Sequence, residues 1–208
     1  MLIFTAVHAE ARAVRKALRA AGALEAVRIF VIGIRATELP KDLPSGAARG
    51  IILAGFAGAL DPKLQIGEVV VDGVLPQGLG TSTFLVGTIH TASDLAATPA
   101  RKSSLRRETD AIAVDMEGEK VRRFADSLGV PFLNIRAISD TAMETLDPAV
   151  LSFVDTFGGI RPWVLARGLM CRPNLIPALI RLGRNSRLAG IQLGKAVVQL
   201  VASNPFGT

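Results

Sequence analysis

The sequence has few of the features that disulfide-bonded, secreted or membrane-spanning proteins require. Its one cysteine, Cys171, cannot form an internal disulfide and has no residues at metal-ligand spacing around it, so we expect a thiol packed as a small hydrophobic group. No apolar run reaches the roughly 20 residues of a membrane span, and the N-terminus lacks the basic start and long apolar stretch of a signal peptide. These absences favour a cytoplasmic protein that is not integral to a membrane.

Aromatic residues are also scarce, and this limits the possible partners. The net charge of +6 raises nucleic acid as a partner, because clustered basic side chains gain from counterion release at phosphates. However, the chain has no tyrosine, no zinc pattern and no nucleic-acid motif, and it offers few aromatic side chains for base stacking. We therefore expect no nucleic-acid partner. No fingerprint of a nicotinamide, flavin or metal site is present either, so we expect no cofactor.

The pattern of apolar runs predicts an α/β fold. A chain of 208 residues can form one substantial core, and we expect a single domain over residues 1–208. Several apolar runs are uninterrupted rather than alternating, which is typical of strands buried on both faces. Helical spacing predicts helices at 10–21 and 117–128, the second ended by Gly129 and Pro131. The predicted strands are 2–7, 27–34, 50–54, 68–74, 83–89, 111–114 and 133–138.

The order of these elements predicts a central sheet covered by helices on both faces. The strand, helix and strand between 111 and 138 indicate a parallel βαβ pairing. After Pro148 the sequence becomes an apolar, helical C-terminal extension, 148–208. Within it, 175–201 interleaves arginine and lysine with leucine, isoleucine and valine. This segment could contact a membrane surface as a basic amphipathic helix, or it could pack on the sheet as a pair of terminal helices.

Polar residues follow the predicted strands at five places. In α/β sheets the ligand lies outside the carboxyl ends of the strands, so these places are the candidate site. Carboxylates occur at three of them. The five places are His8 with Glu10, Gly33 to Arg35, Gly55 to Gly58, Asp115 to Glu117, and Ser139 with Asp140.

Two of these segments suggest a chemistry. The small-residue segment AGFAGA (54–59) predicts a tight turn whose backbone N–H groups can approach an oxyanion or a sugar, although such a turn can also simply allow close helix packing. One carboxylate could accept both hydroxyls of a ribose, while a second, buried one could protonate a departing base. Glycosidic cleavage needs two such roles. The simpler interpretation of Asp115 is a solvated helix N-cap, and of Glu117 and Asp140 helix-end and loop-capping carboxylates.

The segment AVDMEGEKVRRFADSLGVPFLNIRAISD (113–140) resembles the purine nucleoside phosphorylase and methylthioadenosine/S-adenosylhomocysteine nucleosidase superfamily, and the resemblance covers about residues 1–147. It implies the three-layer phosphorylase-like fold and a purine nucleoside as substrate. It also implies that Glu117 binds the ribose hydroxyls and Met116 packs against the sugar. Asp140, supported by Ser139, would bond or protonate the purine at N7.

The resemblance also implies where the nucleophile binds. AVHAEARAV is similar to the family's opening strand and places Glu10 at the attacking water. GFAGAL is similar to the family's Gly-Ser-Ala-Gly turn and places Gly55, Phe56 and Gly58 at the nucleophile. Phe56 replaces the family's Ser or Thr, and 88–97 offers no obvious aromatic to stack on the purine. Arg35 either handles the nucleophile or is an exposed side chain without a chemical role.

The C-terminal sequence narrows the resemblance. VDMEGEK, a Phe-Gly-Gly segment and RPNLIPALIRLGRNSRLA are similar to hopanoid-associated phosphorylases, which implies phosphorolysis of an adenosylhopane-type nucleoside, with phosphate as co-substrate, and a tail that rests on anionic lipid. The alternatives are a nucleosidase for methylthioadenosine or S-adenosylhomocysteine, a binding module without catalysis, and, more remotely, a membrane-surface scaffold. The family resemblance also implies a homo-oligomer.

Overall fold

The computed structural model describes residues 1–207 apart from 42, 44–47 and 76–83. Eight strands form one mixed sheet in the order β2-β1-β3-β8-β4-β5, and β7 pairs with both β3 and β6. The strands are β1 (Leu2–Thr5), β2 (Arg28–Val31), β3 (Ile51–Ala59), β4 (Val69–Asp72), β5 (Leu85–Val86), β6 (Ile89–Thr91), β7 (Ala113–Asp115) and β8 (Phe132–Asp140). The helices are α1 (His8–Ala20), α2 (Pro99–Thr109), α3 (Gly118–Ser127), α4 (Pro162–Cys171) and α5 (Leu175–Ala202), with short 3-10 helices at Leu24–Ala26 and Pro148–Phe153.

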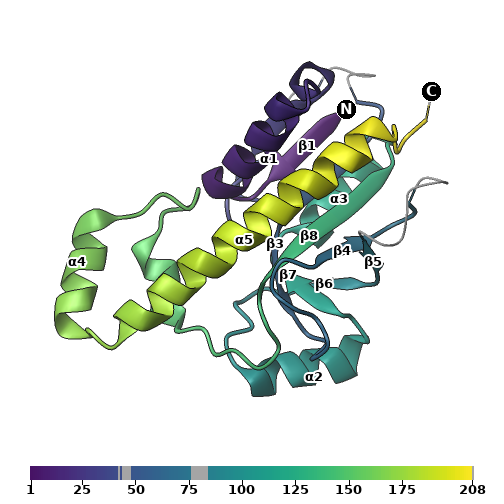
Figure 1. Cartoon of the computed structure of the whole chain (residues 1–208). Coiled ribbons are helices and arrows are strands. Elements are labelled where there is room, and N and C mark those ends of the chain that lie inside the picture. The colour runs from purple at the N-terminus through teal and green to yellow at the C-terminus, as the bar shows by residue number, and fades with distance from the viewer. Residues whose placement is uncertain (42, 44–47, 76–83, 208) are drawn as a thin grey trace.

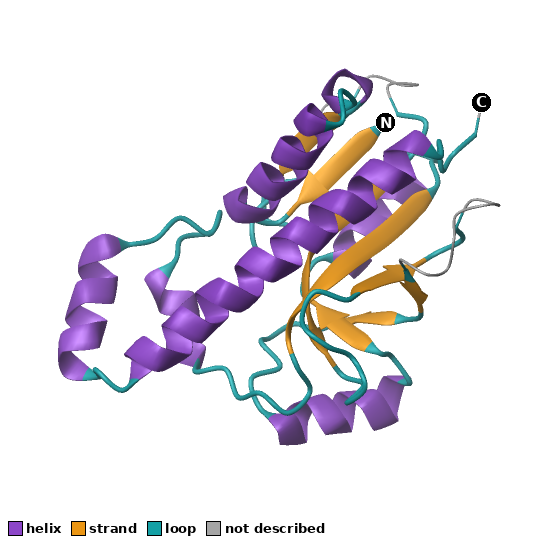
Figure 2. Cartoon of the chain, in the orientation of Figure 1, coloured by secondary structure: helices purple, strands orange, loops and turns teal. Residues whose placement is uncertain are grey.

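Helices cover both faces of the sheet. Successive residues of β1 alternate between two apolar clusters, as strand geometry requires. Ile3 packs with residues of α1 and α5 on one face, while Leu2 and Phe4 pack with residues of α3 on the other. Figure 1 shows α1 and α5 lying side by side across the front of the sheet, and Figure 2 shows the strands enclosed between the helix layers. The predicted three-layer α/β fold is confirmed.

The strands around β3 depart from the predicted pairing. β8 runs parallel to β3, but β7 runs antiparallel to it, with Gly58 opposite Val114, and β7 and β8 do not pair with each other. The predicted parallel pairing of 111–114 with 133–138 is therefore wrong, because β7 joins the far end of β3 and takes β6 as its parallel partner. The predicted strand 83–89 is also divided, since β5 and β6 are separate strands and residue 83 lies outside the described residues.

The segment 54–59 is not a turn. It forms the second half of β3, hydrogen-bonded to β8 on one side and to β7 at its end. Two paired neighbours satisfy the backbone of this small-residue stretch, which is why it stays extended without side chains to pack. Asp140 is likewise the last residue of β8 rather than part of a loop. These two parts of the candidate site therefore lie on strands rather than in loops.

The C-terminal helices divide into a packed part and a projecting part. Residues from Ala189 to Leu200 on α5 are buried in the cluster shared with α1 and β3. Pro177 does not break α5, because it stands in the first helical turn, where no N–H donor is needed. Figure 1 shows α4 and the start of α5 extending beyond the sheet. Cys171, at the end of α4, is exposed, so its predicted packing is wrong.

None of the helices in the described ranges is long and apolar enough to cross a membrane.

Candidate active site

A fully buried arginine organises the site. Arg136 on β8 is 0% exposed and each of its guanidinium nitrogens donates to an acceptor. Nη2 donates to Asp115 Oδ2 at 2.7 Å and to Glu117 Oε2 at 3.3 Å, Nε donates to Asn134 Oδ1 at 3.0 Å, and Nη1 donates to the Phe56 carbonyl at 3.3 Å. A buried guanidinium is tolerated only when it is paired and hydrogen-bonded in this way. Arg136 thereby brings β3, β7, β8 and the start of α3 together.

Asp115 is the permanent counterion of this arginine. Its carboxylate accepts from Thr91 Oγ1 at 2.8 Å, from Asn134 Nδ2 at 2.8 Å and from the Gly118 backbone at 3.1 Å. Burial opposes ionisation, but Arg136 and these donors outweigh it and lower the pKa of Asp115. Asp115 is not a solvated N-cap, because it is buried and only the Gly118 bond is of the capping type.

Glu10 is a buried carboxyl group poised to titrate near neutrality. Oε2 accepts from the backbone N–H groups of Ala6 at 2.8 Å and Val7 at 3.0 Å, and Oε1 accepts from Phe56 N–H at 2.8 Å. Burial raises the pKa of Glu10 to about 7, although Arg136 and the backbone donors lower it in part. A carboxyl group with this pKa can accept or release a proton at neutral pH, which a general base requires.

Glu117 lies between the buried cluster and the open pocket. Its Oε1 accepts from the Arg35 backbone N–H at 3.0 Å, while Oε2 faces Arg136. Arg35 reaches this position with a left-handed backbone (φ 61°), which is unusual for a residue with a side chain. Burial raises the pKa of Glu117, and Arg136 offsets the rise only in part.

Two glycines of β3 leave space for these charges. A Cβ on Gly55 would collide with Arg136 Nη1 and would lie 2.7 Å from Glu10 Oε1. A Cβ on Gly58 would lie 2.9 Å from Asp140 Oδ2. The close approach of side chains from β8 and α1 to the β3 backbone therefore requires glycine at both positions.

Phe56 contributes to the site through its backbone and to the core through its ring. Its N–H and carbonyl bond Glu10 and Arg136, while its ring packs against the cluster formed by α1 and α5. The aromatic ring is thus directed into the core.

A second charged group surrounds Asp140. The fully buried Lys102 of α2 donates from Nζ to Asp140 Oδ2 at 2.5 Å and to the carbonyls of Thr141 at 2.6 Å and Glu144 at 3.2 Å. Ser139 Oγ donates to Asp140 Oδ1 at 3.0 Å and is also within 3.3 Å of the Ala57 carbonyl. Both oxygens of the Asp140 carboxylate are therefore held in place.

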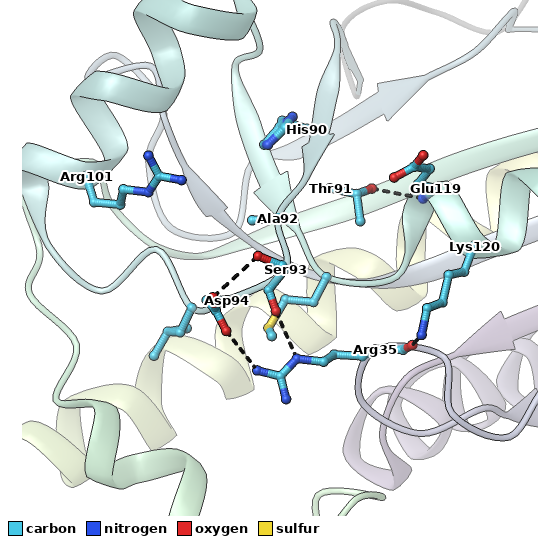
Figure 3. A pocket seen from close by; sticks show the side chains of 11 residues that line it. Arg35, His90, Thr91, Ala92, Ser93, Asp94, Arg101, Glu119 and Lys120 are labelled. Atoms are coloured by element: carbon cyan, nitrogen blue, oxygen red, sulfur yellow. Dashed lines mark hydrogen bonds and ion pairs between the residues drawn. The ribbon is translucent and has the colours of Figure 1, made fainter.

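A pocket of about 570 Å³ opens beside these groups, and Figure 3 shows its lining side chains. Arg35 extends across it, donating from Nε to the Ser93 carbonyl at 2.9 Å and approaching Asp94 at 3.4 Å. Met116 lines this pocket and also a smaller cavity of about 40 Å³ whose walls include Gly58 and Asp140. Asp94 and Leu95 also line both, so the pocket adjoins the cavity beside Asp140.

The structure brings most of the expected residues together. Glu10, Phe56 and Glu117 surround Arg136, while Ser139 and Asp140 form the second group with Lys102. The Arg35 side chain turns away from the Arg136 cluster toward Asp94 and is 47% exposed, so only its backbone N–H meets Glu117.

Sequence reasoning missed both buried cations. Arg136 interrupts the apolar run of β8 and lies two residues from Asn134, so the two polar side chains share one face of the strand. This polar pair within a buried strand was the signal that could have identified Arg136. Lys102 gave no signal, because its segment PARKSSLRRET is mostly polar and carries one large apolar side chain, Leu105.

The chain is similar to known proteins in sequence over part of its length. A sequence model of the phosphorylase superfamily matches residues 76–160. A futalosine hydrolase from Streptomyces coelicolor is 30% identical over 152 residues, which cover 54% of this chain and 65% of that protein, so the chain spans less than two thirds of this relative.

Solved structures extend the likeness to nearly the whole chain. A futalosine hydrolase mutant of Helicobacter pylori has a TM-score of 0.65 at 16% identity and covers 97% of both chains. A methylthioadenosine/S-adenosylhomocysteine nucleosidase from S. pneumoniae, solved with a transition-state inhibitor, has a TM-score of 0.65 at 16% identity and covers 98% of both chains. Residues 76–160 thus match the phosphorylase superfamily, and the chain has the fold of nucleoside-cleaving enzymes in these two structures.

Proposed function

We propose that this protein cleaves the N-glycosidic bond of a purine nucleoside that carries a 5′ substituent, using water as the acceptor. The observation that carries the proposal is that Met116 lines both the open pocket and the small cavity beside Asp140, while Glu117, the next residue, is held by Arg136 and the Arg35 backbone. Glycosidic cleavage needs carboxyl groups in different environments, because the sugar becomes cation-like while the leaving group must be neutralised. The names of the similar proteins point to the same class of reaction.

On the sugar side, we assign Glu117 to the ribose hydroxyls and Met116 to the apolar contact with the ring. The Glu117 carboxyl group is held by Arg136 and the Arg35 backbone, and its neighbours Arg35 and Met116 line the pocket from which a diol would donate to it. On the base side, Asp140 lies at the end of β8 with Ser139 and Lys102 fixing its two oxygens. In this position it can hold or transfer the proton that the departing purine needs at N7.

The charges of the buried cluster favour water over phosphate. The guanidinium of Arg136 is already committed to Asp115, Glu117, Asn134 and the Phe56 carbonyl. A phosphate dianion beside these groups would be repelled by the carboxylates of Asp115 and Glu117, which already engage Arg136. A water molecule instead gains from Glu10, which can take its proton as the C1′–O bond forms. Phosphate, which the sequence resemblance implies as co-substrate, is the competing acceptor.

The 5′ substituent distinguishes two substrates within this proposal. A small substituent would fit a nucleosidase for methylthioadenosine, S-adenosylhomocysteine or futalosine. A large apolar substituent, as in an adenosylhopane-type nucleoside, is favoured by one observation: the outer part of α5 carries exposed apolar side chains, and Ala178 and Leu182 of this helix lie near Ser139 and Asp140. The nucleoside panel described next contains both small and large 5′ substituents and so tests both substrate classes.

The experiment is base release from a nucleoside panel, with and without phosphate, using methylthioadenosine, S-adenosylhomocysteine, futalosine and an adenosine with a long apolar 5′ chain. We expect phosphate-independent release and a free sugar product. Release that requires phosphate and yields the sugar 1-phosphate would overturn the assignment of water. Binding without release of any base would instead support a non-catalytic nucleoside-binding module.

A matched pair of variants tests the role of Asp140. We expect Asp140→Asn to lower kcat by about 10²–10⁴, the contribution typical of general acid–base assistance. Asp110→Asn makes the same chemical change at a side chain that is fully exposed, at the left-handed end of α2, and we expect it to leave kcat unchanged. Near-normal turnover by Asp140→Asn would exclude the proposed role.

A further inference from the structure

An exposed apolar stripe runs along the projecting helices. Trp163 and Met170 on α4 are each 86% exposed, and Ile176 and Ile180 on α5 are also exposed, as is Ile160 just before α4. Trp163 and Met170 are seven residues apart and Ile176 and Ile180 four apart, so each pair lies along one side of its helix. Monomeric proteins rarely expose large apolar side chains in such groups without a partner. These five residues, with the arginines described next, are called the α4–α5 surface.

The same segment carries the positive charge of the whole chain. Residues 156–208 contain seven basic and no acidic residues, while residues 1–155 contain 17 basic and 18 acidic residues. Arg172 and Arg181 pair with Asp147 and Glu144. Arg161, Arg167, Arg184 and Arg187 are exposed, and within the described part of the chain no carboxylate lies within 4.0 Å of their charged atoms. The α4–α5 surface therefore combines exposed apolar groups with unneutralised guanidinium groups.

We propose that the α4–α5 surface docks on an anionic lipid surface. A helix lies in a membrane interface when apolar side chains enter the headgroup boundary and basic side chains remain at the lipid phosphates. Tryptophan favours this boundary because its ring is apolar and its N–H is polar. Each arginine near an anionic bilayer adds to the attraction, so the four unneutralised arginines supply the electrostatic part.

The charge pattern argues against two other occupants. In a two-fold dimer a surface contacts its own copy, which would set arginine against arginine. Residues 1–155, with 18 acidic and 17 basic residues, offer no large acidic excess to receive the surface in another arrangement. Nucleic acid would satisfy the arginines but would leave the isoleucines and Met170 without an apolar environment. An anionic lipid surface satisfies both kinds of side chain.

The inference is independent of the proposed reaction, but the two would be linked in space. The outer half of α5 lines the small cavity that reaches Asp140, through Ala178, Leu182 and Asn185. Arg181 of the same half holds Glu144, whose carbonyl accepts from Lys102. A docked α5 would therefore lie beside the cavity next to the candidate site.

The test uses the full chain and its own tryptophan. Trp163 is the single tryptophan and no tyrosine is present, so emission excited at 295 nm reports on the α4–α5 surface alone. We expect phosphatidylglycerol-containing vesicles to shift this emission to shorter wavelength and to sediment the protein. Pure phosphatidylcholine vesicles should do neither at low salt, and 1 M salt, which shortens the Debye length to about 3 Å, should release the protein. Unchanged emission and no sedimentation with anionic vesicles would overturn the proposal.

Matched variants separate this surface from general positive charge. Replacing Arg161, Arg167 and Arg184 by glutamine should weaken vesicle partitioning by a factor on the order of 100, since each basic residue contributes about fivefold. The control variant removes the same charge from exposed positions of α1, as Arg12→Gln, Lys16→Gln and Arg19→Gln. It should retain more than half of the wild-type partitioning onto vesicles. Equal losses in both triple variants would refute a localised docking surface.

Two further readouts identify other occupants. Trp163→Ser with Met170→Ser should abolish sedimentation with vesicles while base release from a small nucleoside stays at the wild-type rate. A fall in the molar mass measured by light scattering for this double variant would show that a second copy covers the surface. Binding of a DNA or RNA duplex that is lost in the arginine variant but retained in the double variant would show a nucleic-acid surface. Either result would overturn the assignment to lipid.

Discussion

Glu10→Gln should change the dependence of stability on pH in a defined direction. Burial raises the pKa of Glu10 from 4.5 to about 7, so the folded protein binds this proton more tightly than the unfolded chain does. The associated stability is fully present below pH 4.5 and is lost as the pH rises through 7. Glu10→Gln has no titratable proton at this position, so its free energy of unfolding lacks this dependence on pH.

The size of the effect follows from the same pKa. A shift from 4.5 to about 7 corresponds to about 3 kcal/mol, or about 1.4 kcal/mol for each pH unit between the two values. Urea denaturation at intervals between pH 5 and 8 should therefore show the wild type losing stability relative to Glu10→Gln as the pH rises. The exposed Glu25→Gln variant controls for loss of a carboxylate at the surface. A difference between wild type and Glu10→Gln that stays constant from pH 5 to 7 would show that the folded protein already carries Glu10 ionised at pH 5, and would refute this reasoning.

Two further substitutions test the buried charges. Lys102→Met should cost about 3–5 kcal/mol of unfolding free energy, because it leaves the Asp140 carboxylate buried without its cation; adding Asp140→Asn should recover part of this loss, and additive losses in denaturant titrations would deny the coupling. Gly55→Ala should abolish base release and cost on the order of 1–3 kcal/mol, since the new Cβ enters the space of Arg136 and Glu10. Gly183→Ala, on an open position of α5, should instead stabilise the protein by up to about 1 kcal/mol, and equal thermal shifts for both alanines would refute the crowding argument.

Much of the fold could be predicted because burial leaves a direct mark on sequence. β1, α1, α3 and β8 fall where apolar runs and helical spacing place them, since each has at least one face in a core cluster. The position of the site also followed from the chain, because Glu10, Glu117 and Asp140 all stand close to strand ends.

The rest depended on contacts that no local pattern records. α2 buries only Lys102 and Leu105, so its helix has no apolar stripe, and the Thr98 side chain that caps it by accepting from Arg101 N–H is a weak signal alone. The small residues of 54–59 indicated a turn, because the strands that hold them extended, β7 (Ala113–Asp115) and β8 (Phe132–Asp140), lie far along the chain. Asp115 was interpreted as a cap because its counterion, Arg136, is supplied by a different strand.

Helix α5 is continuous over 28 residues and about 42 Å long. It begins beyond the sheet, and its second half packs in the core cluster with α1 and β3. A continuous helix tilts as one piece unless something breaks it. Its inner part shares a core cluster with the ring of Phe56, and the Phe56 N–H donates to Glu10. A tilt of the outer end of α5 would therefore act on Phe56, whose N–H holds the Glu10 carboxyl group on which the proposed reaction depends.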